Sequence, residues 1–218
     1  MEIRRNYTGC TVSILGDSYS TFTGYIPAHQ ESYYPKPEKV PDVSGVEHTW
    51  WMQLTNRMDM RVLVNDSYSG STVCCDVRDG QPPESAFVVR MEKSLSPEGI
   101  EGELPDVIFL FGATNDSWLC REIGRVQFEG WTPQDLRRVL PAYCYLIDYT
   151  VRSNPQALIV CILNDLLNPQ IHEGMRAACA HYGVLCAELK GIDKKFDHPT
   201  RLGMAQIAEQ VERLLKEA

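Results

Sequence analysis

The sequence alternates short, continuously apolar runs with segments of helix length, and this alternation is what most constrains the fold. The apolar runs predict buried strands at residues 11–15, 61–65, 106–111, 157–163 and 184–189. The longer segments predict helices at residues 49–58, 85–91, 133–151 and 169–182 and at the C-terminus. Strands that are apolar throughout are typical of parallel sheets covered on both faces. The pattern therefore predicts an α/β fold with one doubly wound, flavodoxin-like sheet and helices on both faces.

No repeat, linker or low-complexity tract divides the 218 residues, which are enough for one domain with a sizeable core. We therefore expect a single domain, 1–218. Residues 25–45 are rich in proline, tyrosine and charge and predict a long surface loop. In a compact domain such a loop is more often functional than idle.

Charge and hydropathy argue against two classes of partner. The formal net charge is -8, and no run of Lys and Arg suits a nucleic acid. No apolar stretch approaches the roughly 18 residues that a membrane-spanning helix needs, so membrane insertion is not expected. Arg4 and Arg5 are not followed by the apolar run of a signal peptide, and the eight cysteines lack CxxC pairs. These features predict a cytoplasmic protein with reduced thiols, unless an export signal was removed.

Small or polar residues follow the expected strands at 16–18, 66–70, 112–116 and 164–165. In open parallel sheets, ligands bind beyond the carboxyl ends of the strands, so these segments are the candidate site. The nucleotide motifs GxGxxG and GxxxxGK[ST] are absent, as is the zinc motif HExxH. We therefore expect neither a metal nor an organic cofactor.

The chemistry of these segments fits acyl transfer. Ser18 follows a strand at a turn that Gly16 permits, which exposes its hydroxyl as a nucleophile. The backbone N–H groups of Ser18 and Gly70 and the amide of Asn115 can form an oxyanion hole. His198 can take the serine proton and return it to the leaving alcohol.

The same residues resemble the conserved blocks of the SGNH/GDSL hydrolase family. The matching segments, in the family's order, are Gly16-Asp17-Ser18, Gly70, Gly112-Ala113-Thr114-Asn115-Asp116 and His198-Pro199-Thr200. The resemblance spans nearly the whole chain, and it implies the SGNH-hydrolase type of fold and a serine ester hydrolase that forms an acyl-enzyme.

The sequence departs from the family pattern next to the base. Family members commonly carry an aspartate three residues before the histidine, where this chain has Lys195. Asp193, Asp197 or a backbone carbonyl could orient His198 instead. We expect a Ser-His dyad with Asp193 as the third catalytic member.

Trp118, Trp51 and Arg90 are the candidate substrate-binding residues. Aromatic side chains near the site suit a sugar, so the predicted reaction removes a small acyl group such as acetate from a small-molecule or glycan ester. The alternatives are a catalytically silent carbohydrate-binding relative and a lipase or thioesterase of the same fold. A flavodoxin-like signalling domain is a further alternative, but it leaves His198 and Asn115 without a role.

Overall fold

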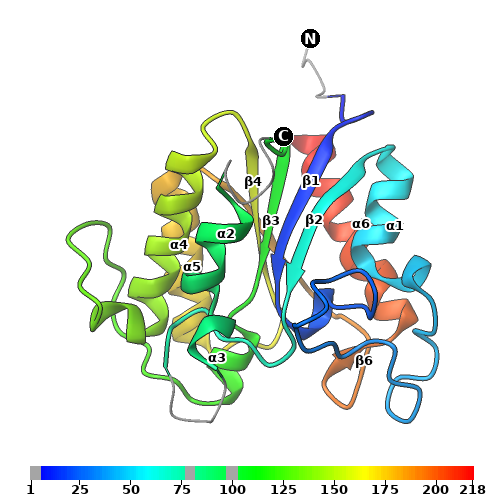
Figure 1. Ribbon diagram of the computed structural model, residues 1–218, viewed down its shortest axis with the longest axis horizontal. Helices are drawn as coiled ribbons and strands as arrows, with labels where there is room; N and C mark the ends of the chain where they lie inside the picture. The colour runs from blue at the N-terminus through cyan, green and yellow to red at the C-terminus, as the bar shows by residue number, and fades with distance from the viewer. Residues whose placement is uncertain (1–5, 77–81, 97–102) are drawn as a thin grey trace.

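A five-stranded parallel sheet lies at the centre of the computed structural model, which describes residues 6–76, 82–96 and 103–218 (Figure 1). The strands are β1 (Thr11–Gly16), β2 (Arg61–Ser67), β3 (Val107–Phe111), β4 (Leu158–Leu163) and β5 (Leu185–Glu188). Their order is β2-β1-β3-β4-β5, and every neighbouring pair is parallel. This is the flavodoxin-like order, and the predicted fold class is confirmed. The prediction of a single domain stays a prediction.

Helices cover both faces of the sheet. The helices are α1 (Trp50–Met58), α2 (Phe87–Ser94), α3 (Thr114–Trp118), α4 (Val139–Ser153), α5 (Pro169–Tyr182) and α6 (Arg201–Glu217). Helices α1 and α6 pack on one face, and α2, α4 and α5 pack on the other, as Figure 1 shows. A short antiparallel hairpin of β6 (Lys194–Lys195) and β7 (His198–Pro199) precedes α6. Single 3₁₀ turns are η1 (Ser18–Ser20), η2 (Val46–His48), η3 (Pro83–Ser85) and η4 (Asp135–Arg137).

The central strand β3 explains why the strands are apolar on both faces. Val107, Phe109 and Phe111 pack against the layer of α1 and α6. Ile108 and Leu110 point the other way, into the layer of α2, α4 and α5. Because successive side chains of a strand alternate between faces, a strand covered on both sides is largely apolar along its length.

The expected start of the long central helix was wrong. The sequence placed it at residue 133, but α4 begins at Val139, and residues 135–137 form the separate turn η4. Pro141 therefore lies in the first turn of α4 rather than bending its middle. A proline is tolerated there because the first N–H groups of a helix have no partner within the helix.

The loop at residues 25–45 is more buried than the sequence predicted. Tyr33, Tyr34, Val40 and Val43 are buried and belong to the core layer that contains α1 and α6. The middle of the loop is therefore part of the folded body.

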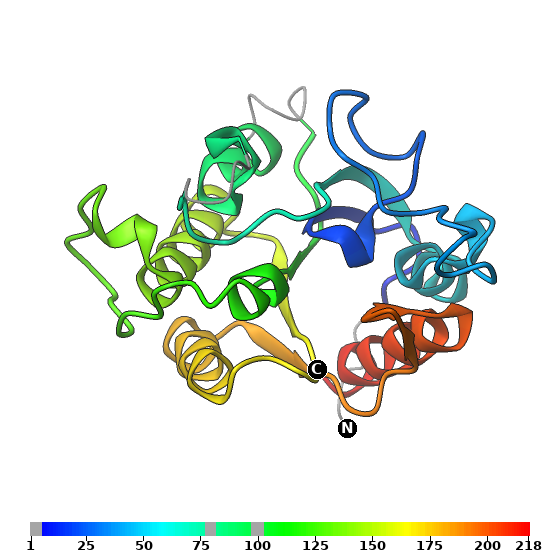
Figure 2. The same ribbon diagram turned by 90° about the horizontal axis from the view of Figure 1, so that it is seen from below.

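The strand order fixes where a ligand site can form. The connections from β1 and β3 lead to opposite sides of the sheet, which makes the carboxyl ends of these two strands the topological switch point. Ser18 lies just after β1, and Asn115 lies just after β3. Figure 2 looks at this end of the sheet, where the blue turn after β1, the green helix α3 and the orange segment before α6 come together.

The cellular location stays a prediction. None of the described helices is both long and apolar enough to span a bilayer. No disulfide bond joins any of the cysteines within the described ranges. Residues 1–5, which include Arg4 and Arg5, lie outside the described residues.

Candidate active site

Ser18 occupies the first position of η1, directly after the end of β1. The buried carboxylate of Asp17 caps this turn by accepting the N–H of Tyr19 at 3.0 Å. A Cβ atom at Gly16 would lie 2.5 Å from the hydroxyl of Ser67 on the neighbouring strand, so only glycine fits there. The turn therefore holds the serine at the edge of the sheet where the sequence predicted it.

His198 reaches Ser18 from the opposite end of the chain. Its Nε2 lies 3.0 Å from the Ser18 Oγ, and its Nδ1 lies 3.1 Å from the carbonyl oxygen of Phe196. Because a carbonyl oxygen can only accept, the geometry assigns the proton to Nδ1. Nε2 then carries the lone pair and accepts the serine hydroxyl, which is the arrangement that a general base requires.

The carbonyl of Phe196 faces the ring because of an unusual turn. Phe196 and Asp197 connect β6 to β7 with φ angles of 48° and 61°, in the left-handed region that non-glycine residues rarely adopt. Tyr19 holds this turn by donating its hydroxyl to the Asp197 carbonyl at 2.6 Å. Lys194, at the start of the hairpin, forms an ion pair with Asp165 after β4. The sheet thus supports the hairpin that carries the base.

The carboxylate of Asp193 lies elsewhere. It accepts the hydroxyl of Thr200, the residue that caps α6, and none of its described hydrogen bonds involves His198. The exposed carboxylate of Asp197 acts on the ring only through its charge, which raises the pKa of His198. Of the three alternatives left open by the sequence, the Phe196 carbonyl is the one hydrogen-bonded to the imidazole.

The surroundings keep His198 neutral. Burial lowers its pKa from 6.5 to about 4, despite the opposing effects of the Phe196 hydrogen bond and the Asp197 charge. Lys39 and Lys36 lower the pKa further because their charges disfavour an imidazolium. A histidine in this environment is unprotonated at neutral pH and can accept a proton.

Two further segments come to the same edge of the sheet. The turn that contains Gly70 is bonded to β1, because the Tyr68 N–H donates to the Gly16 carbonyl at 3.1 Å. The Asn115 Nδ2 donates to the Ser71 carbonyl at 2.8 Å, which joins α3 to this turn. The segments with Ser18, Gly70 and Asn115 are therefore linked to one another.

Asp116 reinforces the link between α3 and the chain after Gly70. Its buried carboxylate accepts the N–H groups of Val73 at 2.8 Å and Cys74 at 3.2 Å. Burial raises the pKa of this carboxyl group, while both hydrogen bonds lower it. Asp116 thus has a structural role.

The candidate oxyanion donors have capacity left for a ligand. Within residues 6–76, 82–96 and 103–218, the backbone N–H groups of Ser18 and Gly70 donate no hydrogen bond. Gly70 adopts a φ of 82°, which a residue with a side chain would find strained. The Asn115 amide has two protons, and its contact with Ser71 uses one of them.

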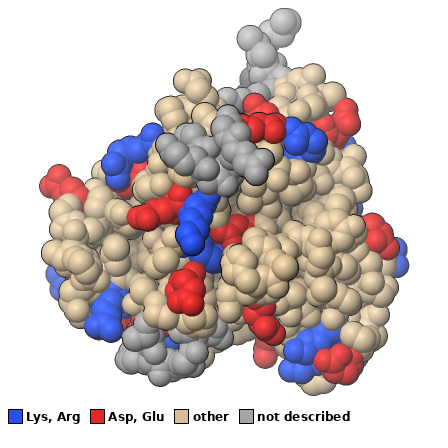
Figure 3. All heavy atoms as spheres, in the orientation of Figure 1, with Lys and Arg blue, Asp and Glu red and all other residues tan. Residues whose placement is uncertain are grey.

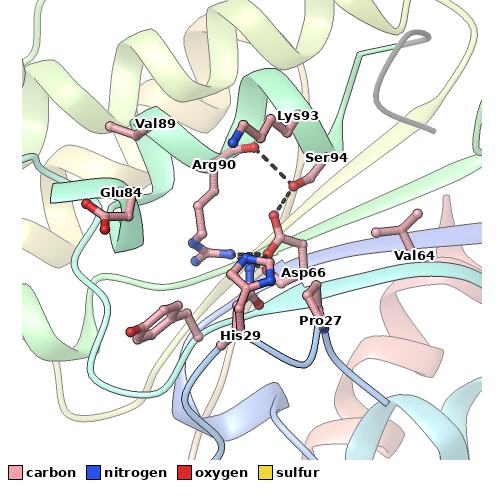
Figure 4. A pocket seen from close by; sticks show the side chains of 11 residues that line it. Pro27, His29, Val64, Asp66, Glu84, Val89, Arg90, Lys93 and Ser94 are labelled. Atoms are coloured by element: carbon pink, nitrogen blue, oxygen red, sulfur yellow. Dashed lines mark hydrogen bonds and ion pairs between the residues drawn. The ribbon is translucent and has the colours of Figure 1, made fainter. Parts of the chain in front are cut away.

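Figure 4 shows Arg90 directed from α2 towards Asp66, in a pocket whose lining residues include neither Ser18 nor His198. Its buried guanidinium contacts Asp66 Oδ1 at 3.0 Å and donates to the carbonyls of Gly16 at 3.0 Å and Ser85 at 2.8 Å. These bonds join the ends of β1 and β2, and none of its described bonds reaches Ser18. The structure therefore places Arg90, predicted as a substrate ligand, in a scaffolding position.

The two candidate tryptophans differ in the same way. Trp51 is 1% exposed and donates its indole N–H to the Ser20 carbonyl at 2.9 Å, so the structure places it in the core. Trp118 is 40% exposed, and its ring centroid lies 5.8 Å from that of His198. Only Trp118 is positioned to contact a substrate beside the base.

Tyr33 is the site residue that the sequence analysis missed. Its ring stacks on the His198 imidazole with the centroids 3.5 Å apart and the planes 2° from parallel. The tyrosine-rich composition of the 25–45 loop was the available signal, but nothing in the sequence singles out this tyrosine.

Nowhere in the described part of the chain do three or more His, Cys, Asp or Glu side chains form a group that could hold a metal ion. Acidic and basic side chains are interspersed over the face shown in Figure 3. The Ser18–His198 pair lies at the carboxyl edge of the sheet.

A doubly wound sheet with a serine after β1 and a histidine before the last helix defines a class of serine hydrolases. The family model for GDSL-like lipases and acylhydrolases matches residues 10–215. The chain belongs to this family, and it is an ester hydrolase. Among curated proteins, none matches the sequence.

Solved structures agree with this assignment. A GDSL-like lipase from Bacteroides ovatus is 38% identical, with a TM-score of 0.88 over 97% of this chain and 100% of that one. A GDSL-like lipase from Bacteroides uniformis is also 38% identical, with a TM-score of 0.85 and 93% of each chain covered. A family two carbohydrate esterase from Clostridium thermocellum has a TM-score of 0.62 at 16% identity, over 95% of this chain and 63% of that one. At that identity the third likeness shows the fold alone.

Proposed function

We propose that the protein hydrolyses esters through an acyl-enzyme on Ser18, with His198 as the general base. The Ser18 Oγ bonds to the ester carbonyl carbon while its proton passes to the His198 Nε2. The negative charge that develops on the carbonyl oxygen is stabilised by the N–H groups of Ser18 and Gly70 and by the Asn115 amide. The proton on Nε2 then passes to the leaving oxygen, which departs as an alcohol.

Hydrolysis of the acyl-enzyme repeats these steps with water. A water molecule gives a proton to the His198 Nε2 and bonds to the acyl carbon, and the same donors stabilise the second oxyanion. The proton then returns to the Ser18 Oγ as the bond to the acyl group breaks. The products are a carboxylic acid and the free enzyme, and no cofactor is consumed.

The Phe196 carbonyl orients the imidazole of the Ser18–His198 dyad, a task that a carboxylate performs in a triad. That carbonyl holds the proton on Nδ1, which leaves Nε2 facing the serine. We propose that Asp193, first expected in this role, instead stabilises the start of α6 through Thr200.

The preferred substrate carries a small acyl group such as acetate on a carbohydrate or similar alcohol. Ser18 is only 2% exposed, which favours a compact acyl group over a long chain at the nucleophile. The exposed indole of Trp118 beside His198 offers a flat apolar surface of the kind on which sugar rings stack. The carbohydrate esterase of similar fold is consistent with this substrate class.

The contact of 3.0 Å between Ser18 and His198 carries the proposal, and active-site labelling tests it. A fluorophosphonate probe should label the wild-type protein and fail to label Ser18→Ala or His198→Ala. Labelling that survives in Ser18→Ala would place the nucleophile elsewhere. An intact protein that takes no label would support the silent carbohydrate-binding alternative.

The acyl group is tested with a series of esters. We expect kcat/KM to fall from acetyl to butyryl to octanoyl nitrophenyl esters, and acetylated sugars to release acetate. Ser18→Ala is the control for background hydrolysis. A preference for the octanoyl ester would reject the small acyl group and favour a lipase.

A further inference from the structure

The ring of Tyr33 covers one face of the proposed base. The imidazole of His198 lies parallel to it at a centroid distance of 3.5 Å. Tyr33 is 8% exposed, so this contact lies inside the protein. A ring at this distance leaves no space for water on that face of the imidazole.

The backbone of Tyr33 is also connected to the nucleophile. Its N–H donates to the Thr21 Oγ1 at 2.9 Å, and the Thr21 hydroxyl donates to the Ser18 carbonyl at 2.9 Å. The next residue, Tyr34, donates its hydroxyl to the Pro199 carbonyl at 2.8 Å. This pair of tyrosines therefore joins the turn of the nucleophile to the hairpin of the base.

The hydrogen bonds of His198 do not by themselves fix the ring. Apart from Ser18, its hydrogen-bond partner among the described residues is the carbonyl of Phe196, two positions away in the same hairpin. One hydrogen bond sets the direction of Nδ1 but lets the ring plane tilt about it. In a Ser-His-Asp triad, a carboxylate holds the imidazole in its orientation. Here a parallel aromatic ring removes the tilt.

We propose that Tyr33 is a positioning residue, whose stacked ring fixes the plane of the His198 imidazole and so aims Nε2 at the Ser18 Oγ. The inference rests on the proposed function of the Ser18–His198 pair. The Tyr33 hydroxyl is buried and bonds to none of the described residues. The ring, and not the hydroxyl, therefore has the positioning role.

The ring also affects when His198 takes up a proton. Other titratable or charged groups face the imidazole: Asp197 in its own hairpin, Lys36, Lys39 and Tyr34 in the loop of Tyr33, and Tyr19 in η1. Loss of the Tyr33 ring leaves all of these in the chain but admits water to the imidazole. Since burial is the largest cause of the lowered pKa of His198, that pKa should then rise towards its ordinary value.

The test compares Tyr33→Phe, Tyr33→Leu and Tyr33→Ala, with Tyr25→Ala as the matched control. Tyr25 lies in the same loop, contacts Phe22 and Trp51, and is 49% exposed. Each variant is assayed for kcat and kcat/KM against pH with an acetyl ester. The pKa of His198 is also measured directly by NMR titration of its labelled imidazole, which does not depend on activity.

We expect Tyr33→Phe and Tyr25→Ala to stay within about threefold of the wild type, with an unmoved acid limb. Tyr33→Leu and Tyr33→Ala should lower kcat by about tenfold to a hundredfold, because a misplaced base loses the benefit of prior orientation. Their acid limb and the NMR pKa of His198 should move upward together. A role in loop packing alone would reduce the folded fraction without moving either pKa.

Three results would overturn the inference. The first is a folded Tyr33→Leu protein that retains the wild-type kcat and the wild-type pKa of His198. If Tyr33→Ala does not fold, Tyr33→Leu alone is the test. The second is a loss in Tyr33→Phe as large as that in Tyr33→Ala, which would assign the role to the hydroxyl. The third is an equal shift in Tyr25→Ala. A wild-type enzyme that neither reacts with fluorophosphonate nor hydrolyses esters would instead refute the dyad itself.

Discussion

The acid limb of the pH–rate profile should lie well below the ordinary range of histidine. The base must be neutral to accept the serine proton, so kcat/KM follows the neutral fraction of His198 in the free enzyme. Burial, aided by the charges of Lys39 and Lys36, lowers the pKa of this imidazole to about 4. At pH 5 the ring is then about 90% neutral, against about 3% for a histidine with a pKa near 6.5. The structure therefore predicts nearly full activity at pH 5, where an ordinary histidine would lose about thirtyfold.

The assay measures initial rates at substrate concentrations well below KM, from about pH 3.5 to 8, by release of acetate. The fold must be monitored by tryptophan fluorescence at each pH. The unfolded chain takes up this proton near pH 6.5, and the native chain takes it up only near 4. The free energy of unfolding therefore falls as the pH falls through that window. An acid limb near pH 6.5 in a folded protein would show that His198 is more solvated than in the structure. An activity that stayed flat below pH 4 would exclude His198 as the base.

Three substitutions test other parts of the site. Asn115→Ala should lower kcat by about a hundredfold to a thousandfold at every pH without moving the acid limb, because it removes an oxyanion donor and leaves the base; a moved limb would contradict that role. Asp193→Ala should keep kcat/KM within about threefold, since the Phe196 carbonyl holds the ring; a loss equal to that of His198→Ala would make the carboxylate the orienting group. Arg90→Met should lower the free energy of unfolding by about 3–5 kcal/mol in urea titrations, because it leaves the buried carboxylate of Asp66 without its cation; an unchanged midpoint would refute this.

The sequence by itself determined the architecture and the order of the functional segments. Strands buried on both faces are largely apolar, so residues 107–111 and their counterparts could be recognised without a structure. Ser18 and Asn115 follow such strands directly, and in a parallel sheet this is enough to bring them to one edge. Both inferences depend on local sequence alone.

The tertiary structure decided which side chains surround the base. The sequence offered Asp193, Asp197 and a backbone carbonyl as partners of His198, and the choice depends on a two-residue turn with two left-handed residues. Nothing in the sequence near Phe196 predicts that conformation. The turn is held by contacts with Tyr19 and other residues distant in the chain.

Packing between distant segments also determined which of the aromatic and basic candidates lie beside His198 and which are buried elsewhere. The sequence offered both Trp51 and Trp118 as substrate-binding residues, but Trp51 fills the core and Trp118 is exposed beside His198. Arg90 can be buried because acceptors from β1, β2 and η3 converge on its guanidinium. Tyr33 stacks on His198 because the loop between η1 and α1 folds back over the hairpin before α6. Which side chains meet in these ways depends on distances between segments far apart in the sequence, and only the folded chain fixes those distances.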